Sequence, residues 1–258
     1  MTAVSASNKM KDTGVILCRC KAGIISDEKL SAISEEVRGL KAHIVELNDL
    51  CALSIDRVDS LRELNRKFRR KIVIACYPRA VENILIQADA PFEGMTVLNS
   101  RKLSVGDIKN ELEKLVFKGE GQHEVISSNL NVPAWFPVVE KKRCQNCGLC
   151  AGFCLFGVYN YSDKHLKVEN PLNCKNNCPA CARACPDSAI IFPRIKEDNF
   201  IAGIDPEEIK INQEEKGLLI ERLRQRNNLR RNIFREDLLK EAKEERQKAV
   251  EESNKNKT

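Results

Sequence analysis

The sequence is poor in aromatic residues and histidine, and it lacks long apolar runs. Aromatic side chains make up 5% of its 258 residues, with a single tryptophan, and there are three histidines. No stretch approaches the roughly 18 consecutive apolar residues that a membrane-spanning helix needs. Residues 1–12 lack the basic start and apolar core of a secretion signal, and we expect them to be disordered. These absences predict a cytoplasmic protein whose thiols stay reduced.

Recognisable catalytic motifs are also missing. The sequence shows no Ser/His/Asp set, no nucleotide-binding loop and no carboxylate pair that differs from ordinary surface. The three histidines, His43, His123 and His165, fall in an expected strand, linker and hairpin. No catalytic residue is therefore assigned, and whether the chain is an enzyme stays open. The net charge of +6 is mild and does not single out nucleic acid as a partner.

Cysteine is the residue that the chain does have, with twelve copies, eight of them in two short runs. The runs read CxxCxxCxxxC and CxxxCxxCxxxCP. Four thiolates within about a dozen residues suit iron-sulfur clusters or zinc, and a third closely spaced cysteine in each run favours cubane clusters. The runs consist of Cys144, Cys147, Cys150 and Cys154, and of Cys174, Cys178, Cys181 and Cys185, which Pro186 follows.

The segment that carries the runs, residues 132–200, resembles a bacterial two-cluster ferredoxin domain of the α+β class. The resemblance implies two 4Fe-4S clusters with crossed ligation, in which three cysteines of each run share a cluster with the fourth of the other. Gly148 would keep its loop close to a cluster, and Pro186 would turn the chain toward a short strand near residues 188–192. The implied ligand sets are Cys144, Cys147, Cys150 and Cys185, and Cys174, Cys178, Cys181 and Cys154.

Two positions depart from the ferredoxin pattern. Leu155 stands where a proline usually follows the first run, and the second run has one extra residue between its first two cysteines. Neither change removes a ligand, although both bear on the shape of the loops.

Zinc remains an alternative to iron. Radical chemistry is another, because Cys174, Cys178 and Cys181 spell the CxxxCxxC of S-adenosylmethionine enzymes, but the residues after this motif are too few for the barrel of such an enzyme.

Before the runs, short apolar stretches alternate with amphipathic ones. The pattern predicts strands at 14–18, 42–47, 71–76 and 95–99, and helices at 26–37, 56–68, 79–88 and 106–117. Ser26 or Asp27 is expected to cap the first helix. Such alternation predicts an α/β domain over residues 13–117, with a parallel sheet covered by helices.

The other four cysteines lie near the ends of the expected strands. Cys18 ends the first strand with Cys20 just beyond it, Cys51 lies in the loop after the second, and Cys76 ends the third. The carboxyl ends of parallel strands share one edge of a sheet, where ligands are normally bound. All four thiols could therefore meet and hold a third 4Fe-4S cluster. The alternative is that they are small buried residues of the core.

This N-terminal region also resembles a known family. The strings VILCRCKAGI (15–24), ELNDLCAL (46–53) and KIVIACYPR (71–79) are similar, in this order, to the N-terminal domain of the large flavin subunit of heterodisulfide reductase. The resemblance implies a cluster-binding role for the four cysteines within these strings. In that family a flavin domain with a Gly-rich fingerprint follows. Gly119 and Gly121 lack the third glycine of that motif, so no flavin is expected in this chain.

Two further segments complete the predicted organisation. Residues 118–131 are polar and are expected to form a linker. Residues 201–258 are rich in Lys, Arg and Glu and are expected to form a charged helical tail, with an arginine cluster between residues 222 and 235. The tail could be a solvated helical surface, dock to a partner protein, or bind nucleic acid, for which its nearly balanced charge is a weak footprint.

These features predict an iron-sulfur protein that relays single electrons at low potential. It would act as a subunit or partner of a heterodisulfide-reductase-like oxidoreductase complex, beside a flavin- or disulfide-reducing subunit. The alternative function is a regulatory or assembly protein whose clusters sense oxygen or redox state and whose tail binds another macromolecule.

Overall fold

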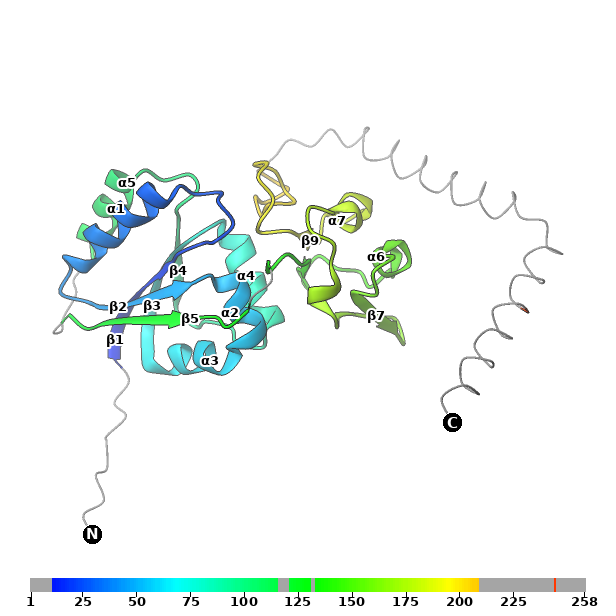
Figure 1. Ribbon diagram of the computed structural model, residues 1–258, viewed down its shortest axis with the longest axis horizontal. Helices are drawn as coiled ribbons and strands as arrows, with labels where there is room; N and C mark the ends of the chain where they lie inside the picture. Colours follow the sequence, from blue (N-terminus) through cyan, green and yellow to red (C-terminus); the bar gives the residue numbers. More distant parts are fainter. Residues whose placement is uncertain (1–10, 116–120, 131–132, 209–243, 245–258) are drawn as a thin grey trace, which may run out of the picture. The chain divides into compact units, whose positions relative to one another are not determined.

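Five parallel strands form the sheet of the N-terminal part in this computed structural model, which describes residues 11–115, 121–130, 133–208 and 244 (Figure 1). The strands are β1 (Lys11–Cys18), β2 (His43–Asn48), β3 (Phe68–Ala75), β4 (Met95–Asn99) and β5 (His123–Ser127), in the order β4-β3-β1-β2-β5. All pairings are parallel. Val15, Ile16 and Leu17 of the central strand β1 are fully buried, as in strands covered on both faces. The predicted α/β domain is confirmed.

Helices cover both faces of this sheet (Figure 1). Helices α1 (Asp27–Arg38) and α5 (Val105–Glu113) pack on one face, and α2 (Leu50–Asp56), α3 (Val58–Lys67) and α4 (Pro78–Gln87) pack on the other. Helix α1 begins as predicted, because the Ser26 side chain accepts a hydrogen bond of 3.3 Å from the Lys29 amide. Gly14 in β1 has no room for a Cβ, which would meet the Phe68 ring at 2.6 Å.

Strand β5 corrects the predicted linker over residues 118–131, of which residues 118–120 and 131 lie outside the described part. Its sequence HEVIS is short and half polar, so the sequence alone does not indicate a strand, and the strand is recognised only by its pairing with β2. The buried carboxylate of Glu46 on β2 helps to hold β5, because the His123 ring nitrogen lies 2.9 Å from it. Ser34 and Arg38 of α1 donate hydrogen bonds to the same carboxylate. Burial alone would raise the pKa of Glu46, but these hydrogen bonds lower it to about 2.

A second correction concerns the region after β2. The sequence predicted one helix over residues 56–68 and a loop around Cys51. Instead, α2 starts just after β2, with Cys51 in its first turn. Arg57 separates α2 from α3, because its φ of −132° is not helical. The break lets both short helices bury their apolar sides, which include Leu53 and Leu61, in the same core.

The C-terminal part consists of short elements. They are β6 (Val138–Val139), α6 (Leu149–Phe153), β7 (Tyr159–Ser162), β8 (His165–Val168), the 3-10 helix η1 (Pro171–Asn173), α7 (Ala180–Ala184) and β9 (Ile190–Ile191). Strands β6 and β9 pair antiparallel, and β7 and β8 form the expected hairpin. None of the helices in the described ranges has the length and apolar character needed to cross a membrane.

One hydrophobic core joins the two parts, and residues 11–208 belong to one compact unit. Leu53 and Ile84 lie in the same buried cluster as Trp135 and Phe192, whose rings stack at 5.2 Å. The cluster extends to Ile201, Ala202 and Ile204, so the predicted tail over residues 201–258 does not begin at 201. The remaining expected helices of the tail and residues 1–10 lie outside the described residues. Lys11 and Asp12, which were expected to be disordered, belong to β1 instead.

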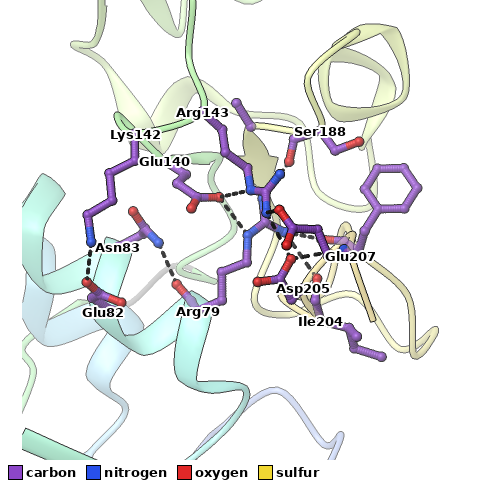
Figure 2. A network of polar contacts seen from close by, with 12 residues as sticks. Arg79, Glu82, Asn83, Glu140, Lys142, Arg143, Ser188, Ile204, Asp205 and Glu207 are labelled. Atoms are coloured by element: carbon purple, nitrogen blue, oxygen red, sulfur yellow. Dashed lines mark hydrogen bonds and ion pairs between the residues drawn. The ribbon is translucent and has the colours of Figure 1, made fainter. Parts of the chain in front are cut away.

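A buried arginine fastens α4 to the C-terminal part (Figure 2). Arg79 is 8% exposed and donates 2.7 Å to Glu140, which is 12% exposed. It also donates to the backbone carbonyls of Ser188, Phe200 and Ile204. Five donors in a fixed fork suit the guanidinium to such a junction.

Replacing this arginine should destabilise the unit. Arg79→Met leaves three buried carbonyls without this donor, and we expect a loss of about 3–5 kcal/mol in the free energy of unfolding, measured by anaerobic urea denaturation. The control is Lys142→Met. Lys142 pairs with Glu82 across the same junction but is 78% exposed, so its loss should cost about 1 kcal/mol or less. Equal losses in the two variants would contradict the role given to Arg79.

Candidate functional site

The four N-terminal cysteines line a single pocket, called the sheet-edge pocket, at the carboxyl edge of the sheet. Cys18 ends β1, Cys20 lies two residues further, Cys51 is in α2, and Cys76 directly follows β3. Because β2 and β3 flank β1 on opposite sides, the chain reverses its winding at β1, and such a point opens a crevice that binds ligands. The structure therefore brings together the four thiols that the sequence placed near strand ends.

The rest of the sheet-edge pocket is mostly apolar, with three charged residues. Two of these, Asp49 and Arg101, come from the α/β part, whereas Arg194 comes from the segment after β9. The apolar wall includes Ile24, Ile25, Leu50, Ala80, Val81, Ile84 and Pro193. In this pocket Cys18 and Cys51 are buried, and Cys20 and Cys76 are half-buried.

Burial dominates the chemistry of these thiols. It raises the pKa of Cys76 to about 12, and it raises the pKa of Cys18 and Cys51 as well. Charge on the neighbouring thiols raises these pKa values further, Cys20 acting on Cys18, Cys76 and Cys51, which shows that the four sulfurs lie close together. Backbone amides offset part of this cost.

Two backbone N–H groups point at sulfur in the sheet-edge pocket. The Leu50 amide donates to Cys18 Sγ at 3.5 Å, and the Ala22 amide donates to Cys20 Sγ at 3.4 Å. Hydrogen bonds of this kind stabilise thiolates and tune the potential of clusters that thiolates bind. The pocket thus offers sulfur ligands that are already partly stabilised in their charged form.

Cysteines of both runs line a second pocket, called the crossed pocket. Its sulfur residues are Cys144, Cys147, Cys150 and Cys185, the set that the ferredoxin resemblance implied. Burial raises the pKa of Cys150 to about 12, and the charge of Cys181, which lies outside this pocket, raises it more than those of Cys185 and Cys144. The Ala189 amide donates to Cys185 Sγ at 3.4 Å.

The remaining cysteines of the two runs form a third set, called the third thiol group. It consists of Cys154, Cys174, Cys178 and Cys181. After burial, the largest causes of the raised pKa of Cys174, about 12, are the other three thiols of this group. Burial likewise raises the pKa of Cys181 to about 11, although the Tyr159 hydroxyl donates to its Sγ at 3.1 Å and lowers it. Tyr159 is a site residue that no sequence motif indicated.

The two runs share a repeated local structure that explains this crossing. Each has an asparagine with positive φ, Asn146 at 52° and Asn177 at 58°, which asparagine tolerates better than most residues. A five-residue helix follows, α6 or α7, with a cysteine at its second position and another, Cys154 or Cys185, as its C-cap. The C-cap cysteine of each run joins the set that the other run begins.

Gly148 and Pro186 lie beside the crossed pocket, as the resemblance implied. Gly148 has φ +73°, and a Cβ there would meet the Tyr161 ring at 2.7 Å. The Tyr161 hydroxyl in turn donates 2.9 Å to the Asn146 carbonyl. Hairpin β7–β8 therefore supports the loop that carries Cys147, and only glycine fits beneath its tyrosine.

The arrangement of the thiols bears on the kind of metal group that they could hold. In the described part of the chain, no three Cys, His, Asp or Glu side chains converge closely enough to hold one metal ion. A cubane offers a separate iron atom to each thiolate, so its ligands stand farther apart than four ligands around one zinc. All twelve cysteines are free thiols. Each of the three sets has the number of thiolates that a cubane cluster binds.

Comparison with known proteins agrees with the ferredoxin resemblance. The chain is 41% identical over 61 residues, 23% of its length, to a protein of Methanocaldococcus jannaschii that is named an uncharacterized ferredoxin. The match covers 42% of that protein, so the chain spans less than half the length of this relative. No family model and no solved structure matches the chain. The resemblance of residues 14–117 to the flavin subunit of heterodisulfide reductase stays a prediction.

The burial of the thiols predicts an order of chemical modification. In reduced, chelator-treated protein at pH 8, iodoacetamide should label the exposed Cys147 first and the four buried cysteines, Cys18, Cys51, Cys150 and Cys181, last. The thiolate is the nucleophile, and the raised pKa of Cys18 and Cys51 slows them further. Mass spectrometry of tryptic peptides over time measures the order, and Cys147→Ser should remove the fastest step. Equal rates at Cys51 and Cys147 would show that the sheet-edge pocket is open to solvent.

Proposed function

We propose that this protein transfers single electrons through three 4Fe-4S clusters. The observation that carries the proposal is the sorting of twelve cysteines into three sets of four, of which the sheet-edge pocket draws its thiols from three separate strand ends. The relative named as a ferredoxin supports an electron-transfer role. A bound four-iron cluster accepts and donates one electron at a time, at potentials around −400 mV in many ferredoxins.

In this proposal the residues around each set control the environment of the sulfurs. The apolar wall of the sheet-edge pocket keeps water away, and the amides of Leu50 and Ala22 donate hydrogen bonds to Cys18 and Cys20. Tyr159 has the same role toward Cys181 in the third thiol group. Each of these donors favours negative charge on sulfur.

The shared core gives the relay a fixed geometry. The sheet-edge pocket belongs to the α/β part, while the crossed pocket and the third thiol group belong to the C-terminal part, and Arg79 and the buried cluster around Trp135 hold the two together. A rigid junction keeps the distance between redox centres constant, which electron transfer within one chain requires.

The proposed redox partner is a flavin- or disulfide-reducing subunit of a heterodisulfide-reductase-like complex. Support comes from the resemblance of the strings around Cys18, Cys51 and Cys76 to the large flavin subunit of that enzyme. A cytoplasmic, reducing compartment fits the free state of all the thiols.

Metal analysis tests the proposal directly. Anaerobically purified protein should contain about twelve iron and about twelve acid-labile sulfide atoms per chain, and reduction should produce electron paramagnetic resonance signals of interacting four-iron clusters. Cys76→Ala should lower the iron content to about eight. The control Ser100→Ala changes another wall residue of the sheet-edge pocket and should retain about twelve.

Other results would count against part or all of this function. An iron content of about eight in the unaltered protein would return the cysteines of the sheet-edge pocket to a structural role. Colourless protein, or protein that contains only zinc, would end the electron-transfer proposal.

A further inference from the structure

Arg194 reaches the sheet-edge pocket from outside the α/β part. It follows β9 in the C-terminal part, yet it lines the pocket beside the four cysteines and is only 9% exposed. Its guanidinium pairs with the carboxylate of Asp49, which is 6% exposed. An arginine is rarely buried to this extent unless it has a partner that needs its charge.

The backbone at Asp49 is held in an unfavourable conformation. Asp49 has φ 79°, in the left-handed region that non-glycine residues seldom adopt. It lies two residues before Cys51 and directly beside Leu50, whose amide donates to Cys18. Strain of this kind persists where the surrounding structure requires it, often at functional sites. At this position it places a carboxylate against Arg194 at the rim of the sulfur ligands.

One donor of Arg194 is left over. The ion pair with Asp49 uses a terminal nitrogen, while Nε is buried and has no hydrogen-bond partner. Buried donors without a partner are rare, and each calls for an acceptor such as an ion or ligand. The second carboxylate oxygen of Asp49, Oδ1, is also buried without a partner, and the further acceptors that the pocket would gain on loading are sulfur atoms.

The electrostatics of the pocket agree with this geometry. Burial by itself would lower the pKa of Arg194, but the charges of Cys51, Asp49 and Cys20 raise it. The guanidinium therefore lies within the field of the sulfur ligands. The other cation of the pocket, Arg101, differs because its terminal nitrogens already donate to Ile195, Lys196 and Asp198.

The crossed pocket has the opposite electrostatic character. Its lining residues include Asp187 and no lysine or arginine. A positive charge beside a cluster stabilises the reduced, more negative form, and a negative charge disfavours it. The two pockets should thus hold electrons with different affinity.

We propose that Arg194 raises the reduction potential of the cluster in the sheet-edge pocket above that of the cluster in the crossed pocket, by placing its charge and its Nε–H against the sulfur atoms. This inference rests on the proposed function, since it requires a cluster in the sheet-edge pocket. Arg194 thereby favours electron transfer from the crossed pocket toward the sheet-edge pocket.

The test is a redox titration of the full, anaerobically loaded protein, followed by electron paramagnetic resonance. The signal of the sheet-edge pocket is identified as the one that Cys76→Ala removes. Arg194→Gln should lower its midpoint potential so that, at a fixed applied potential, the ratio of reduced to oxidised cluster falls about tenfold, which corresponds to about 59 mV for one electron. The midpoint of the cluster in the crossed pocket, which Arg194 does not line, should stay unchanged.

Three further variants separate charge from structure. Arg194→Lys keeps the charge without Nε, and its shift should be smaller than that of Arg194→Gln. Asp49→Asn removes the negative partner and should move the midpoint upward. The control Arg66→Gln removes an exposed arginine on α3 and should have no effect on any midpoint.

The outcomes are distinguishable from failure of the proposed function. The inference is wrong if Arg194→Gln retains about twelve irons but the midpoint of the sheet-edge cluster is unchanged or rises. A rise is the result expected if Arg194 only seals the pocket. Its loss would then let water in, and water favours the more charged, reduced form of the cluster. If Arg194→Gln loses the signal of the sheet-edge pocket, the midpoints of Arg194→Lys and Asp49→Asn test the inference in its place. An unchanged midpoint in Asp49→Asn would overturn it. About eight irons in the unaltered protein would instead remove the third cluster from the proposed function, and this inference with it, while electron transfer through two clusters would stand.

Discussion

Parallel strands that all end at one edge are the constraint on which the rest of this molecule depends. The chain winds one way from β1 to β2 and then returns past β1 to β3, so three loops leave the sheet around one crevice. Cys18, Cys51 and Cys76 lie at or just after those ends and meet in this crevice, although they are far apart in the sequence. The hydrophobic faces that bury the sheet also bury the thiols.

The two parts of the chain bring their cysteines together in different ways. In the α/β part, a large core and long strands fix the positions of ligands that are far apart in sequence. In the C-terminal part, the elements are only two to five residues long, and the repeated turn with a left-handed asparagine, Asn146 or Asn177, sets the cysteines instead. Elements this short bury little apolar surface of their own, and they pack against the core that they share with the α/β part.

Much of this arrangement could be predicted from the sequence, because it depends on local patterns. The alternation of apolar strands and amphipathic helices predicted the α/β domain, and the resemblance to two-cluster ferredoxins implied the four cysteines that line the crossed pocket. Strand β5 was missed because its five residues are half polar and are strand-like only against β2. Asp49 and Arg194 were missed because a left-handed aspartate and a lone arginine carry no pattern, and their pairing exists only after the two parts have docked.

The walls of the sheet-edge pocket have a consequence for how the protein is made. All four of its cysteines precede residue 77, whereas Pro193 and Arg194, which complete its wall, are encoded far downstream. A ribosome therefore exposes the thiols of the nascent chain well before it has polymerised the residues that cover them. During this interval the sulfur ligands are open to oxidants and to donors of iron, and the pocket closes only when synthesis has passed Arg194.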